Sequence, residues 1–195
     1  DKHVGPTEYN PNLPIWLSID ENVHPYFSCT VWQIEIEYDE PKHGERTGKI
    51  RRKKATQIDE LCMRNPYNTV LGLCNEIKRR YKSHTSGMLI TGDATSNKQD
   101  VKVERGFNLF NLIYNELEEY NPQMRQPKSN PSVYVRGQFI NTCLFSNFGA
   151  IEILVGENNK ESVNDWVNTK QDSDGTKQKK KVADDDTGIR YEEHG

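Results

Sequence analysis

The sequence lacks the features that identify a membrane protein, a disulfide scaffold or a cysteine-based metal site. No apolar run is long enough to span a bilayer, and no signal peptide opens the chain. The four cysteines are scattered and form no Cys-x-x-Cys pair, so free buried thiols in a reducing compartment are expected. The five histidines show no ligand spacing either, and nothing in the sequence supports a Cys–His nucleophile.

The sequence also lacks a large excess of positive or negative charge. The 195 residues carry a formal net charge of −3, with 28% charged and 33% hydrophobic residues. A chain of this length can bury one domain with a real core. The charge balance gives no global indication of a polyanionic partner, so any surface that binds nucleic acid must be local.

A nucleotide-binding loop is missing as well. Residues 44–50 imitate a phosphate loop, but three residues rather than four separate Gly44 from Gly48. Ile50 stands where a Ser or Thr should hold magnesium. The segment is predicted to be a hairpin turn, and the chain is expected to have no ATP site of its own.

Apolar periodicity and turn residues predict a definite order of strands and helices. Strands are expected at residues 14–20, 26–38, 49–58, 88–92, 123–127 and 151–155. Helices are expected from a cap at Asn68 or Thr69 to Tyr81, from Phe107 to Leu117, at 132–147 and at 159–169. The second strand has apolar residues of both parities, which indicates burial on both faces or a bulge. Residues 1–13 are polar and contain Pro6 and Pro11, so a linker from a preceding domain is expected, in a chain that begins at Asp1 and is interpreted as a fragment.

Three early strands followed by alternating helices and strands predict an α/β fold. The sheet should be mixed, with helices on both faces. This order is the ribonuclease H-like plan, in which the first strand lies beside the strand that follows the first helix. The ends of those two strands should then be neighbours.

An aspartate follows each of these two strands. Asp20 comes after Ile15, Leu17 and Ile19, and Asp93 comes after the run from Met88 to Gly92. Taken singly, either residue could be only a turn former, a helix cap or an Asx-turn. Two carboxylates at neighbouring strand ends could instead share divalent metal ions, because Mg²⁺ and Mn²⁺ favour oxygen ligands and keep several waters.

Two basic tracts could contact phosphates without reading bases. The first is Lys49, Arg51, Arg52, Lys53 and Lys54, and the second is Lys177, Lys179, Lys180 and Lys181. The Asp172–Gly175 turn predicts that residues 169–182 fold as a β-hairpin arm whose lysines face the groove leading to the aspartates. The alternative interpretation of each tract is a solvated charged face.

Several segments together carry a family likeness over almost the whole chain. They are Leu13 to Asn22, Ile90 to Thr95, Asn130 to Val133 with Arg136, Ile140-Asn141, Asp165, Lys170, Asp174-Gly175, Lys177, Asp186 to Gly188 and Tyr191 to Gly195. The sequence resembles the nuclease domain of the large terminase subunit of tailed bacteriophages. Gly92-Asp93-Ala94-Thr95 and the terminal segment are the most specific parts of the likeness.

The resemblance implies a ribonuclease H-like nuclease domain over residues 14–195 that cleaves concatemeric viral double-stranded DNA during packaging. Asp20 and Asp93 match the first two carboxylates that hold two Mg²⁺ or Mn²⁺ ions. The family's third carboxylate would lie beyond Gly195, with Asp184, Asp185 or Asp186 as the alternative. The implied partners are DNA, the ATPase domain of the same subunit, the small terminase subunit and the portal protein, in the cytoplasm of the infected host and without a membrane.

Two other functions remain open on the residues alone. The first is another ribonuclease H-like DNA enzyme, such as a transposase, an integrase or a Holliday-junction resolvase. The second is a catalytically inactive docking domain of the packaging motor. Substitution of Asp20 would separate docking from catalysis, because docking should survive it.

Overall fold

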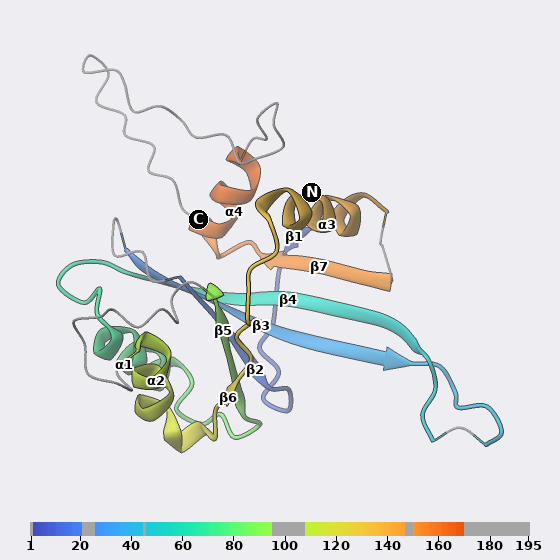
Figure 1. Ribbon diagram of the computed structural model, residues 1–195, viewed down its shortest axis with the longest axis horizontal. Helices are drawn as coiled ribbons and strands as arrows, with labels where there is room; N and C mark the ends of the chain where they lie inside the picture. Colours follow the sequence, from blue (N-terminus) through green and yellow to red (C-terminus); the bar gives the residue numbers. More distant parts are fainter. Residues whose placement is uncertain (1, 21–25, 45, 95–107, 147–149, 170–195) are drawn as a thin grey trace, which may run out of the picture.

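One mixed seven-stranded β-sheet organises the domain in the computed structural model, which describes residues 2–20, 26–44, 46–94, 108–146 and 150–169 (Figure 1). The strands are β1 (Val4–Gly5), β2 (Ile15–Asp20), β3 (Phe27–Tyr38), β4 (Ile50–Met63), β5 (Met88–Gly92), β6 (Gln123–Met124) and β7 (Ile151–Gly156). The helices are α1 (Val70–Arg80), α2 (Leu109–Glu116), α3 (Val133–Ser146) and α4 (Lys160–Asn168), with a 3₁₀ turn at Glu118–Tyr120.

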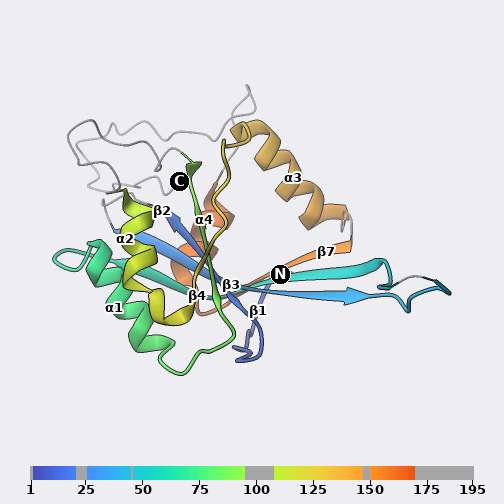
Figure 2. The ribbon, with the colours of Figure 1, turned by 60° about the horizontal axis from the view of Figure 1, so that its bottom comes forward.

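The strand order across the sheet is β1-β7-β4-β3-β2-β5-β6. Strands β2, β3 and β4 pair antiparallel, whereas β5 is parallel to β2 and β7 is parallel to β4. This arrangement confirms the predicted α/β, ribonuclease H-like sheet, with β2 beside the strand that follows the first helix. Figure 2 shows β3 and β4 extending beyond the other strands as a two-stranded ribbon.

The hydrophobic core lies between the sheet and helices α1 and α2. The odd-numbered residues of β2 and of the first half of β3 face it, because side chains alternate along a strand. The central buried residues are Ile15, Leu17, Ile19, Phe27, Cys29, Val31, Leu73, Ile77, Ile90, Phe110 and Ile113. Thr69 caps α1, since its Oγ1 accepts a hydrogen bond from the backbone N–H of Gly72 at 3.0 Å.

Strand β4 is longer than predicted. It was expected to end at Ile58, but it continues to Met63 and pairs with β3 along its whole length. The register shifts where Val31 pairs with Asp59 and Trp32 pairs with Gln57, so Ile58 is the extra residue. The irregularity considered for the second strand is therefore a bulge in its partner, and it lets both halves of β4 keep their pairing.

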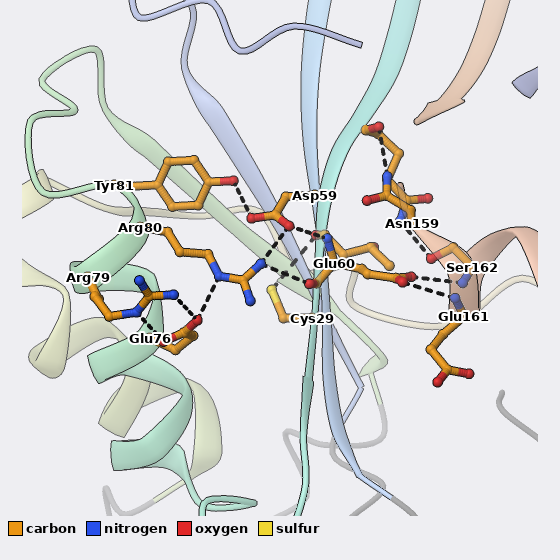
Figure 3. Close-up of polar contacts among 12 residues, drawn as sticks. Cys29, Asp59, Glu60, Glu76, Arg79, Arg80, Tyr81, Asn159, Glu161 and Ser162 are labelled. Carbon is orange, nitrogen blue, oxygen red and sulfur yellow. Dashed lines mark hydrogen bonds and ion pairs between the residues drawn. The ribbon is translucent and has the colours of Figure 1, made fainter. Parts of the chain in front are cut away.

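Asp59 and Glu60 follow the bulge and point to opposite faces of the sheet (Figure 3). The Asp59 carboxylate accepts hydrogen bonds from Arg80 at 2.6 Å and from the Tyr81 hydroxyl at 3.0 Å, which fastens the end of α1. The Glu60 carboxylate accepts the backbone N–H groups of Glu161 and Ser162 at 2.9 and 2.8 Å, at the start of α4. Helices thus cover both faces of the sheet, as predicted, and the N–H groups at the start of α4 are satisfied by a carboxylate.

The first residues of the chain join the sheet. Val4–Gly5 pairs parallel with β7, a short strand that the sequence did not predict. Further along, the backbone N–H of Asn10 donates to Gln33 Oε1 at 2.8 Å, and Gln33 Nε2 donates to the Asn10 carbonyl at 2.7 Å. The segment expected to be a linker is therefore attached to the sheet at two points.

Glu76 should make the stability of the domain depend on pH. Hydrogen bonds from Arg79, and then from Arg80, lower the pKa of its carboxyl from 4.5 to about 2. The ionised carboxylate therefore stabilises the fold above the unfolded pKa, and this contribution is lost as the pH falls towards about 2. We expect Glu76→Gln to lower the thermal midpoint of unfolding near neutral pH. The difference in midpoint between the variant and the wild type should shrink as the pH falls towards about 2. Glu118→Gln, at an exposed position, is the control. A midpoint difference for Glu76→Gln that stays constant with pH would contradict the stabilising role of the ionised Glu76 carboxylate.

Candidate metal centre

The two aspartates predicted from the sequence lie at the ends of adjacent parallel strands. The last registered pair between β2 and β5 is Ile19 with Gly92. Asp20 is the last residue of β2, and Asp93 follows the last residue of β5. Each is one residue beyond that pair, so both occupy the same edge of the sheet.

Alternation along β2 turns Asp20 away from the hydrophobic core. Ile15, Leu17 and Ile19 are almost fully buried in the core, and Asp20 has the opposite parity. It pairs with Ser28 on the neighbouring strand β3, and both side chains are half-buried. The carboxylate is therefore on the face of the sheet that also carries Ser18 and Thr30, rather than in the apolar layer.

Gly92 lets β5 approach β2 closely just before Asp93. A Cβ at this position would overlap the carbonyl oxygen of Ile19 and would lie 2.8 Å from Cζ of Phe110. No side chain larger than hydrogen fits without a shift of backbone or ring. The glycine that precedes Asp93 in the sequence is therefore required by the close packing at this position.

The segment between β6 and α3 holds Asp93 from the other side. Asn130 Nδ2 donates to Asp93 Oδ1 at 2.5 Å, and Asn130 Oδ1 accepts the backbone N–H of Ala94 at 3.0 Å. Gln126 Nε2 donates to the backbone carbonyl of Asp93 at 2.7 Å. Sequence reasoning did not identify Asn130 or Gln126 as site residues, although Asn130 opens one of the segments that carry the family likeness.

The carboxylates of Asp20 and Asp93 are the type of ligand that a hard divalent cation prefers. Two carboxylates are only part of a complete ligand set. Carboxylate oxygens are the ligands that Mg²⁺ and Mn²⁺ prefer. Within the described ranges, no group of three or more His, Cys, Asp or Glu side chains could hold a metal ion. Asp184, Asp185 and Asp186 lie outside the described residues, as do Lys177, Lys179, Lys180 and Lys181 and the expected hairpin arm.

The environments of the four cysteines do not favour nucleophilic catalysis. All four are free, as the sequence predicted. Burial raises the pKa of Cys62 and of Cys74 to about 12, and it also raises the pKa values of Cys29 and Cys143. Burial thus disfavours the thiolate, which is the nucleophilic form of cysteine.

The first basic tract is partly neutralised by acidic neighbours on the ribbon. Arg51 pairs with Glu37 at 2.7 Å, and Arg52 pairs with Glu37 at 3.3 Å and also with Glu152. These pairs favour the interpretation of this tract as an ion-paired surface. Residues 44 and 48 lie between the antiparallel strands β3 and β4, so the imitation of a phosphate loop is a hairpin connection, as predicted.

The sheet order defines an α/β domain with a ribonuclease H-like mixed sheet. The chain is similar to solved structures of the large terminase of a thermophilic bacteriophage, with 12% identity and a TM-score of 0.51 for one crystal form. The ADP and ATP-γ-S complexes of that terminase each match with 14% identity and a TM-score of 0.53. Each match covers 91% of this chain and 38% of the terminase chain, so the likeness is one of fold and spans well under half of that protein.

No protein-family model matches the chain, and no curated protein matches it. Among the described helices, none is long and apolar enough to cross a membrane.

Proposed function

We propose that this chain is the nuclease domain of a phage large terminase subunit and cleaves double-stranded DNA with divalent metal ions. The observation that carries the proposal is the register of β2 and β5, which brings Asp20 and Asp93 to one edge of a ribonuclease H-like sheet. The fold likeness to a phage large terminase supports the same class. The absence of a phosphate loop from the sequence favours a nuclease over an ATPase.

Asp20 and Asp93 would hold the metal ions, with Mg²⁺ or Mn²⁺ as the expected species and two ions as the expected number. When bound, such ions supply an activated water and charge stabilisation at the leaving oxygen of the phosphodiester. The protein's own contribution is positional. Two parallel strands fix the backbones of the carboxylates, Gly92 allows the close approach of those strands, and Asn130 contacts the second carboxylate.

The partners follow from the proposed reaction. Double-stranded DNA is the substrate, concatemeric during genome packaging, and Lys177, Lys179, Lys180 and Lys181 are proposed to contact its phosphates. Backbone contacts position DNA without specifying its sequence, so sequence preference should be slight. The ATPase domain of the same subunit, the small terminase subunit and the portal protein are the proposed protein partners, in the cytoplasm of an infected host.

The fold likeness also fits a second candidate, a catalytically inactive docking domain of the packaging motor. The described residues contain two aspartates at the sheet edge but no group of three potential ligands. A domain that had lost its metal centre would keep the fold and the sheet order. It would differ from a nuclease in having no cleavage activity and no requirement for metal.

We expect the full natural chain to nick and linearise supercoiled plasmid in the presence of Mn²⁺ or Mg²⁺. Excess EDTA should stop cleavage, and added Mn²⁺ should restore it, because the proposed mechanism uses no protein nucleophile. Gel electrophoresis of the plasmid after each treatment is the measurement. Cleavage that continues in EDTA would contradict a metal-dependent mechanism, and no cleavage with either ion would favour the docking domain.

A further inference from the structure

Asn130 is placed to control the geometry of one proposed metal ligand. It belongs to the segment between β6 and α3, thirty-seven positions after Asp93 in sequence. Its side chain contacts two consecutive residues at the end of β5, the carboxylate of Asp93 and the backbone N–H of Ala94. Few side chains can make this pair of contacts, because one end must donate and the other must accept.

The chemistry of the two neighbours determines the orientation of the Asn130 amide. A backbone N–H can only donate, so the amide oxygen must face Ala94. An ionised carboxylate can only accept, so the amide NH₂ must face Asp93. The Ala94 contact therefore aims the donor at the Asp93 carboxylate, and the hydrogen bond to a charged oxygen is of the stronger type.

The residues just before Asn130 are hydrogen-bonded to β5 and to Asp93, which fixes the path of this segment. The backbone N–H of Arg125 donates to the Ile90 carbonyl at 2.7 Å, and Gln126 donates to the Asp93 carbonyl. Asp93 is thus held at its backbone by Gln126 and at its carboxylate by Asn130. The first contact sets where the residue lies, and the second restrains the torsions of its side chain.

We propose that Asn130 is a positioning residue that orients the Asp93 carboxylate for a divalent metal ion. The inference rests on the proposed nuclease function. A carboxylate has two oxygens and about four acceptor sites, so one hydrogen bond on Oδ1 is compatible with metal coordination. Residues that orient metal ligands in this way typically contribute about 10- to 100-fold to metal affinity or activity.

The test is Mn²⁺ binding by isothermal titration calorimetry on the full chain without DNA. We expect Asn130→Ala to weaken Mn²⁺ binding by roughly 10- to 100-fold. Asn141→Ala, which removes an exposed asparagine of α3, is the matched control and should bind as the wild type does. Gln126→Ala should have a smaller effect than Asn130→Ala, because it releases the backbone of Asp93 and leaves its carboxylate contact intact.

A second variant keeps the test informative if the alanine variant is poorly folded. Asn130→Ser retains a polar side chain but is too short to bridge both neighbours, so it should show the same direction of change. Circular dichroism without metal identifies a variant that has merely lost structure. In plasmid cleavage, the Mn²⁺ concentration for half-maximal rate should rise for the Asn130 variants, while the rate at saturating Mn²⁺ stays closer to that of the wild type.

The outcomes separate the two proposals. Wild-type binding of Mn²⁺ that is lost in Asp93→Asn but unchanged in folded Asn130→Ala and Asn130→Ser would overturn the role of Asn130 and leave the nuclease assignment standing. A wild-type protein that neither binds Mn²⁺ nor cleaves DNA would overturn the proposed function, and the role of Asn130 with it. Selective weakening in the Asn130 variants supports the inference.

Discussion

DNA cleavage is expected to be lost when Asp20 or Asp93 is replaced by asparagine in the full natural chain. The substitution keeps the size of the side chain but removes a negative charge from a site proposed to concentrate divalent cations. The loss should exceed the roughly 10- to 100-fold effect of changing a residue that only supports a metal ligand. Initial rates of plasmid cleavage in Mn²⁺, for each variant beside the wild type, are the measurement.

Asp39→Asn is the matched control for these variants. Asp39 is an exposed aspartate at the turn between β3 and β4, away from the ends of β2 and β5, and its substitution should leave cleavage unchanged. Unfolding midpoints for all three variants check that the fold is intact. Wild-type rates in either Asp20→Asn or Asp93→Asn would reject the assignment of the metal centre.

Gly92→Ala is expected to damage both stability and metal binding. The added methyl group would overlap the Ile19 carbonyl oxygen and press on the Phe110 ring, so β5 must move away from β2. Overpacking of this kind typically costs about 1–3 kcal/mol. Because Asp93 is the next residue, the same movement should separate it from Asp20 and weaken Mn²⁺ binding.

Gly137→Ala provides the opposite control for this steric argument. Gly137 lies within α3, and a Cβ built there meets nothing within 4 Å. Alanine should therefore stabilise the domain, by about 0.4–1 kcal/mol, through its better helix propensity and the smaller entropy of its unfolded chain. Chemical denaturation of both variants is the measurement, and a Gly92→Ala protein as stable as the wild type would show that β5 has room at this point.

The central part of the fold could be predicted because local patterns and topology agree there. The alternation of β2 and the apolar run of β5 both end in an aspartate, and the order of elements makes these strands neighbours. The extension of β4 to Met63 was missed because Asp59 and Glu60 look like the start of a loop. Their charges are satisfied by Arg80 and by the start of α4, which are distant in sequence.

The contacts around Asp93 could not be predicted for a related reason. Asn130 and Gln126 reach Asp93 only because the segment after β6 continues along the edge of β5. Nothing in the local pattern of residues 125–130 indicates that path, and asparagine before proline is an ordinary turn signal. A site residue that acts through one tertiary hydrogen bond leaves little trace in a single sequence.

The bulge at Ile58 also limits how this domain can change in length. Adding or deleting one residue within a paired strand turns every following side chain to the other face. In β4 a change before Asp59 that the bulge does not absorb would turn Asp59 towards α4 and Glu60 towards α1, and both helices would lose their hydrogen bonds to these carboxylates. Insertions and deletions in this strand are therefore best tolerated at Ile58, at the second register shift beside Arg51, or in the turn between β3 and β4. The two-stranded ribbon can then vary in length while the part of the sheet between the helices keeps its register.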